Sequence, residues 1–233
     1  LGLSELYPFK PEEKIIEYMI KEDGELTSMN LKEFNNELAS ESPAPGGGSV
    51  AALSGSLGAS LIAMVSNLTF KKKKYKKVWD EVEKAGMESQ NLKDRMVNIV
   101  DSDTEIFNRF MKALRMPKST DEEKKARKEK MQEMTIKIAE SPLDLLRLLG
   151  EMIPHLKTLS ENGYESSISD VGVGSSMIRS AAEGAYLNVL INLPDIEDEK
   201  VKEDMKKEAK NLLDKILETS EKVFSEIKES LEK

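Results

Sequence analysis

The most informative segment of this sequence is ASESPAPGGGSVAALSGSLGASLIAMVSNLTFKKKK, residues 39 to 74. A loop with two prolines and three glycines leads into a long uncharged run, and four lysines follow. Residues 50 to 68 are long enough to cross a membrane, but serines and glycines interrupt them and lower their hydrophobicity. Small side chains let another backbone approach closely, so we expect a helix buried on most sides of a bundle.

The rest of the chain shows helical periodicity and no convincing alternation of the kind strands show. Together these patterns predict an all-α fold, a helical bundle with long antiparallel helices and small-residue buried helices. We divide it into a linker segment with a short helix, 1–28, and one helical domain, 29–233. The predicted helices cover residues 11–21, 31–38, 78–114, 141–162, 170–193 and 201–233. A further helix is predicted to begin at a capping box formed by Thr120 and Glu123. The helix at 141–162 is predicted to begin at Ser141-Pro142.

Composition excludes several classes of function. The 233 residues carry a net charge of -8, which disfavours a general nucleic-acid binder because phosphate contacts need an excess of Lys and Arg. Cysteine is absent, so no thiolate nucleophile is available, and no set of residues has the spacing of a metal site. We expect a cytoplasmic protein that does not enter a membrane. The first residue is Leu rather than Met, which suggests a piece of a longer chain.

Two features of the opening stretch suggest a ligand. Gly46, Gly47 and Gly48 can bring backbone amides close to a bound group, and we expect Ser49 to cap the helix that follows. A plain helix cap is the simpler interpretation, because no Lys-Ser or Lys-Thr pair follows as in a P-loop. The lysine run at Lys71, Lys72, Lys73 and Lys74 is either solvated surface or a site for an anionic tail.

Polar residues also fall on apolar helix faces. Asp103 lies at the centre of an apolar stripe, whereas Asp101 points elsewhere, and a buried carboxylate must be paired, hydrogen-bonded or protonated. A structural ion pair and a catalytic acid both remain open. Asn188 and Asn192 are one turn apart on an apolar helix, where an interhelical hydrogen-bond pair is the simpler alternative to a ligand contact. His155, the single histidine, is expected at the solvent edge.

Three motifs carry a family resemblance. SPAPGGGSVAAL, VDSDTEIFNRFMKALRMPKSTDEEKKAR and SDVGVGSSMIRSAAEGAYLNVLINLPDI resemble, in order and spacing, the cyclodeaminase and cyclohydrolase family of folate enzymes over roughly residues 29 to 220. LGLSELYPFKPEEKIIEYMI, residues 1 to 20, resembles the segment that joins the transferase and cyclodeaminase halves of bifunctional members.

The resemblance implies an ammonia-lyase of histidine degradation and one-carbon metabolism, which cyclises formimino-tetrahydrofolate to methenyl-tetrahydrofolate and releases ammonia. The alternatives are a methenyltetrahydrofolate cyclohydrolase and a non-enzymatic helical assembly protein. The resemblance further implies no metal, no cofactor beyond tetrahydrofolate as the substrate carrier, and a homodimer or higher homo-oligomer. It makes Asp103 the general acid, and Lys71, Lys72, Lys73 and Lys74 the site for a polyglutamate tail. The remaining substrate-binding residues of this hypothesis are Pro45, Gly46, Gly47, Gly48, Ser49, Lys118, Arg127, Asp170, Asn188 and Asn192.

Overall fold

The computed structural model describes residues 24–233, apart from the side chains at positions 103, 104 and 107. The predicted helix at 11–21 lies outside this part of the chain. Within it the fold is all-α, as predicted, and contains no strand. The elements are α4 (Leu31–Leu38), α5 (Gly47–Thr69), η1 (Lys73–Val78), α6 (Trp79–Leu114), α7 (Asp121–Asn162), η2 (Glu165–Ser167), α8 (Ile168–Asn192), η3 (Leu193–Asp195) and α9 (Glu199–Leu231).

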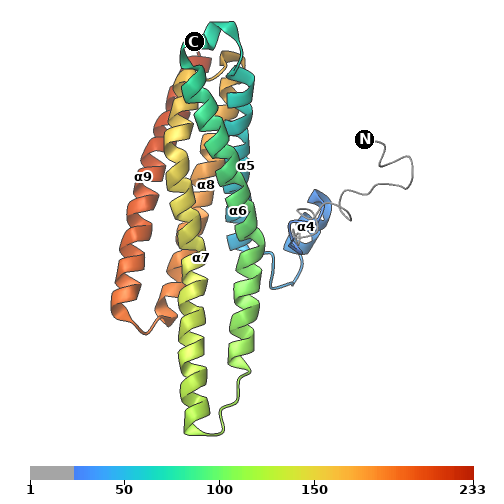
Figure 1. Cartoon of the computed structure of the whole chain (residues 1–233), viewed down its shortest axis with the longest axis vertical. Helices are drawn as coiled ribbons and strands as arrows, with labels where there is room; N and C mark the ends of the chain where they lie inside the picture. The colour runs from blue at the N-terminus through green and yellow to red at the C-terminus, as the bar shows by residue number, and fades with distance from the viewer. Residues whose placement is uncertain (1–23) are drawn as a thin grey trace, which may run out of the picture.

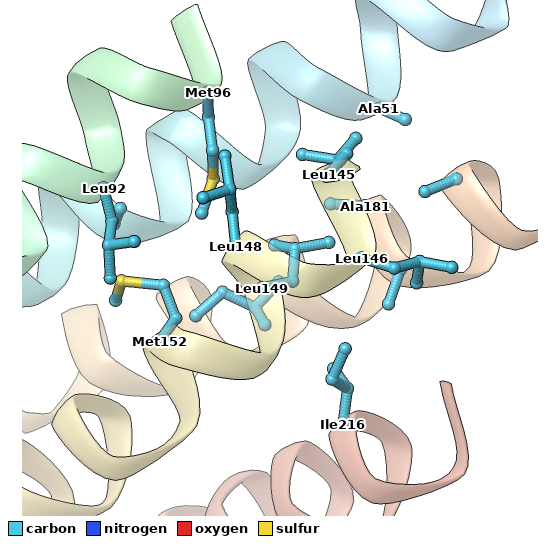
Figure 2. Packing of buried hydrophobic residues seen from close by; sticks show 14 of the residues in the cluster. Ala51, Leu92, Met96, Leu145, Leu146, Leu148, Leu149, Met152, Ala181 and Ile216 are labelled. Atoms are coloured by element: carbon cyan, nitrogen blue, oxygen red, sulfur yellow. The ribbon is translucent and has the colours of Figure 1, made fainter. Parts of the chain in front are cut away.

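The five long helices α5 to α9 form an antiparallel bundle, with α4 to its side (Figure 1). At one end α6 and α7 project together past the other helices (Figure 1). Apolar side chains on the second half of α7 fill the centre of the bundle, where they meet side chains of the neighbouring helices (Figure 2). The buried residues shown there include Leu92, Met96, Leu145, Leu146, Leu149, Met152, Ala181 and Ile216.

The helix predicted from the small-residue stretch is α5, and it packs against α6, α7 and α8. A Cβ at Gly58 would lie 3.0 Å from the carbonyl oxygen of Gly174, so this glycine permits the close approach of α5 and α8. By length and composition α5 could cross a membrane, but 56% of its most apolar window is buried inside the bundle. Its hydrophobicity is therefore accounted for by packing between helices.

Three serine hydroxyls of α5 donate hydrogen bonds to backbone carbonyls of α6. Ser49 bonds Val100 at 3.1 Å, Ser56 bonds Lys93 at 3.2 Å, and Ser66 bonds Val82 at 2.7 Å. As the residue number of the serine rises along α5, the residue number of its partner in α6 falls, as expected for two antiparallel helices. The expectation that Ser49 caps α5 is wrong, because the helix already begins at Gly47 and its N-cap residue is Gly46. Ser49 is the third helical residue and faces α6 instead.

The helix predicted to begin at Ser141-Pro142 is also placed differently. α7 runs without a break from Asp121 to Asn162, with Pro142 and Pro154 inside it. Its true start is the predicted capping box, in which the Glu123 amide donates to the Thr120 hydroxyl and the Glu123 carboxylate accepts from the Thr120 amide. The helix holds together although one backbone hydrogen bond is missing there, because apolar residues are buried on both sides of Pro142: Met134 and Ala139 before it, and Leu143 and Leu146 after it.

Candidate functional site

A hollow of about 210 Å³ opens where the start of α5, the middle of α7 and the end of α8 meet. It contains most of the glycine loop and both asparagines that the sequence singled out. The lining residues are Pro43, Ala44, Gly46, Gly47, Gly48, Ser49, Ile138, Pro142, Asn188, Ile191 and Asn192. Pro45 is next to this wall in sequence but is not part of it. None of the lining side chains is charged.

The first turn of α5 supplies hydrogen-bond donors to the hollow. Val50 makes the first intrahelical bond, from its amide to the Gly46 carbonyl at 3.0 Å. The amides of Gly47, Gly48 and Ser49 therefore have no acceptor within the helix, and the partial positive charge of a helix start lies beside them. This end of the hollow is suited to a carbonyl or another electron-rich group of a ligand.

Asn188 and Asn192 hydrogen-bond within their own helix. The Asn188 side-chain amide donates to the Gly184 carbonyl at 2.8 Å, and that of Asn192 donates to the Asn188 carbonyl at 2.7 Å. The alternative of an interhelical pair is therefore wrong. Each amide group keeps an oxygen and a second N–H with which it can contact a ligand. Asn188 also lies against the loop, since a Cβ on Gly47 would be 3.5 Å from its nitrogen.

The bond between Ser49 and Val100 joins the hollow to α6. Asp103 lies in α6, three residues after Val100 and thus less than one turn away along the backbone. Its side chain is outside what the structure describes. Asp101 accepts hydrogen bonds from the amides of Leu26 at 2.8 Å and Thr27 at 3.3 Å. This carboxylate thus anchors the turn before α4.

Two of the predicted groups lie at the opposite end of the bundle. Asp170 is in the first turn of α8, and at 1.5 Å per residue it is about 27 Å along the helix from Asn188. The lysine run follows the end of α5, about 35 Å from Gly47 on the same estimate. Within one chain, neither group shares the hollow with the glycine loop.

At that opposite end the lysines contact local partners. The Lys72 ammonium lies 3.9 Å from the centre of the Tyr164 ring, and Lys74 pairs with Glu165 at 2.6 Å. Hydrogen bonding and charge from Lys74 lower the pKa of the Glu165 carboxyl. All of these groups are on the surface, where such pairs contribute little to stability.

Lys118 and Arg127 lie on the projecting part of α6 and α7. Lys118 is exposed in the connection between the two helices, and Arg127 donates from Nε to the Leu114 carbonyl at 3.2 Å. Nearby, between α6 and α7, is a groove of about 290 Å³ with four cationic side chains and one carboxylate. Its lining residues are Arg109, Lys112, Ala113, Met116, Lys130, Glu133, Met134 and Lys137.

Sequence reasoning missed the part of the hollow that α7 and the end of α8 provide. Ile138, Pro142 and Ile191 look like ordinary core or boundary residues in the sequence. Pro142 carries a usable signal, since a proline inside an apolar helical pattern removes a backbone hydrogen bond. The sequence pattern instead predicts a helix start at this position, because proline favours the first turn of a helix.

Comparisons with known proteins agree with the fold. The sequence model of the formiminotransferase-cyclodeaminase family matches residues 30–211. Formimidoyltransferase-cyclodeaminase of Gallus gallus is 36% identical over 228 residues, which are 97% of this chain and 42% of that protein. Methenyltetrahydrofolate cyclohydrolase of Methylorubrum extorquens is 35% identical over 198 residues, 85% of this chain and 95% of that enzyme. The crystal structure of formiminotetrahydrofolate cyclodeaminase from Thermotoga maritima has a TM-score of 0.75 at 28% identity, over 89% of this chain and 98% of that one.

Proposed function

Because the chain belongs to the formiminotransferase-cyclodeaminase family, we propose that it is a formimidoyltetrahydrofolate cyclodeaminase. The chain spans 42% of the length of the Gallus gallus relative, so the proposal concerns the cyclodeaminase reaction alone. In that reaction the second folate nitrogen attacks the formimino carbon and forms a tetrahedral centre. The bond from this carbon to the amino nitrogen then breaks, and the products are methenyl-tetrahydrofolate and ammonia.

The difficult step is the departure of nitrogen. An amide ion is too basic to leave, so the amino group must first gain a proton, and overall the reaction takes up one proton to form the methenyl cation and ammonia. A carboxylic acid can supply that proton if its surroundings keep it protonated near neutral pH. We assign this role to Asp103, on the family resemblance and on its position in α6 within one turn of Val100.

The observation that carries the proposal is the hollow itself. It joins the glycine loop to Asn188 and Asn192, and the Ser49 bond places it beside the helix that contains Asp103. Its uncharged lining of amides, carbonyls and apolar side chains is suited to a flat heterocycle with both donors and acceptors, such as a pterin ring.

A methenyltetrahydrofolate cyclohydrolase is the second candidate, because the Methylorubrum extorquens enzyme aligns over 95% of its length. Such an enzyme would add water to the methenyl carbon instead of expelling ammonia. Incubating the purified chain with formimino- and methenyl-tetrahydrofolate in separate reactions distinguishes the two candidate functions. We expect formation of the methenyl product and ammonia from the first compound. Turnover of the methenyl compound alone would establish the second candidate.

We further propose that the chain forms a homodimer through α5 and α8. Each helix has an outward apolar stripe, and the stripe on α8 borders the hollow at Ile191, whose exposed fraction is 74%. A second copy on this face would bury the stripes and close the hollow. The exposed residues are Val50, Leu57, Met64 and Leu68 of α5 with Val173, Leu187 and Ile191 of α8. Light scattering at assay concentration tests this, and a fully active monomer would contradict it.

A further inference from the structure

One helical hydrogen bond is missing in the wall of the hollow. Proline has no backbone N–H, so Pro142 cannot donate to the carbonyl of Ile138, four residues before it in α7. The proline ring also crowds that carbonyl and pushes it away from the helix axis. A backbone carbonyl without its helical donor is a strong acceptor, and it is costly to bury without a partner.

Both ends of the missing bond lie at the hollow. Ile138 and Pro142 are among its lining residues, and a helical carbonyl at position 138 is directed along the axis toward position 142. Opposite them are the free amides of Gly47, Gly48 and Ser49. The hollow thus has backbone donors on the α5 side and a backbone acceptor on the α7 side.

We propose that the carbonyl oxygen of Ile138 accepts a hydrogen bond from an N–H group of the bound ligand, which makes Pro142 a positioning residue of this site. The choice of ligand rests on the proposed function: the amino and lactam N–H groups of a pterin ring are the matching donors. The pterin carbonyl then meets the amides at the start of α5. In this arrangement Pro142 does not touch the reacting atoms. It leaves the Ile138 carbonyl free for the ligand, because proline has no backbone N–H to donate.

The test restores the missing N–H. Pro142→Ala and Pro142→Val both give Ile138 its helical partner in this buried position; alanine is smaller than proline and valine is larger, so the pair separates the restored N–H from a change in volume. Pro154→Ala is the matched control: Pro154 is also inside α7, but it is exposed and does not line the hollow. Tetrahydrofolate binding is measured by calorimetry, formimino-tetrahydrofolate turnover by initial rates, and thermal stability by circular dichroism.

We expect both Pro142 variants to weaken tetrahydrofolate binding roughly 3- to 10-fold and to raise KM by a similar factor, as for the loss of one hydrogen bond, with kcat less affected. Their melting temperatures should not fall, and Pro154→Ala should bind normally. A loss in Pro142→Ala that Pro142→Val does not share would assign the effect to the lost ring and overturn the proposal. So would unchanged binding in both variants. If the wild-type chain binds tetrahydrofolate without turning over the formimino compound, the binding comparison still decides this inference while the proposed reaction fails.

Discussion

The hydroxyl of Ser49 donates a hydrogen bond to the carbonyl of Val100 at 3.1 Å and so fixes the glycine loop to the helix that contains Asp103. Ser49 is almost fully buried, with 1% of its surface exposed. Because Ser56 and Ser66 make the same kind of bond further along the interface, α5 cannot slide on α6 without breaking all three. The position of the loop relative to α6 is therefore set by packing along the whole of α5.

Ser49→Ala should separate this positioning role from stability. The variant loses one neutral hydrogen bond, which is typically worth about 1 kcal/mol of unfolding free energy. Ser66→Ala is the matched control, since its buried hydroxyl bonds the same pair of helices at the far end. In urea denaturation we expect similar losses of stability from both variants. Only Ser49→Ala should lower kcat/KM, and equal activity in the two would show that the bond has no role in the site.

Asn188→Ala should weaken substrate binding while the fold remains stable. The Asn188 side chain bonds only to its own helix within the described part of the chain, and alanine favours helix formation more than asparagine does. Loss of one or two ligand hydrogen bonds should raise KM by roughly 10-fold. The exposed Asn211 of α9 provides the control substitution, Asn211→Ala. Steady-state kinetics on both variants checks this, and the expectation fails if the two KM values agree.

Asp101 should hold the turn before α4 in place rather than act in the chemistry. Its carboxylate accepts from the Leu26 and Thr27 amides, and bonds to a charged acceptor are worth roughly 1.5–3 kcal/mol. A Cβ on Gly24 would lie 1.9 Å from the Asp101 carboxyl carbon, so Gly24→Ala should displace the turn from the other side.

Hydrogen exchange of residues 24–38 measures this effect. We expect faster exchange in Asp101→Asn and in Gly24→Ala, with turnover within a few-fold of wild type. The exposed Asp94 of α6 supplies a control, Asp94→Asn, in which exchange should not change. A loss of activity in Asp101→Asn as large as that expected for an acid catalyst would place the acid at Asp101 instead.

His155 should make the fold less stable in mild acid. Burial lowers the pKa of this imidazole below its usual 6.5, and Lys84 adds to the effect while Glu88 and Glu151 oppose it. The unfolded chain therefore takes up the proton first as the pH falls. Stability from this group is complete above about pH 6.5 and is lost as the pH falls through the lowered value.

Urea denaturation at about pH 7.5 and about pH 5.5 tests the sign of this effect. Wild type should lose more unfolding free energy between the two conditions than His155→Gln, in which the titrating group is absent. The difference should be small, because the side chain is only half-buried. A larger loss in the variant would reverse the predicted direction.

The sequence correctly predicted structural features that depend on a single helix. The small residues of α5 and the Thr120 capping box each indicate a local feature, and the structure contains both. The errors arose where tertiary packing overrides local preference. Pro142 has a low helix propensity but lies inside α7, because the buried apolar residues before and after it stabilise the helix.

The candidate site was predictable in part. Glycine loops and asparagines on apolar faces are visible in a sequence, and the hollow contains both. Which charged residues lie near the glycine loop and the asparagines depends on the direction in which each helix runs in the bundle. Hydrophobic periodicity does not give this direction. The antiparallel arrangement of α5 and α8 brings Gly47 to Asn188 and leaves Asp170 and the lysine run at the other end. Ile138 is proposed to act through its backbone carbonyl, which side-chain patterns do not reveal.

If Asp103 delivers the proton with which ammonia leaves, the Asp103→Asn variant should release ammonia far more slowly than wild type. Asparagine has nearly the same size and still forms hydrogen bonds, but it cannot give up a proton. We predict a folded variant that binds tetrahydrofolate like wild type and releases ammonia from formimino-tetrahydrofolate roughly 100- to 10,000-fold more slowly, which corresponds to about 3–5 kcal/mol of barrier. Ammonia release at more than about a third of the wild-type rate, far above the range for a lost general acid, would contradict the account.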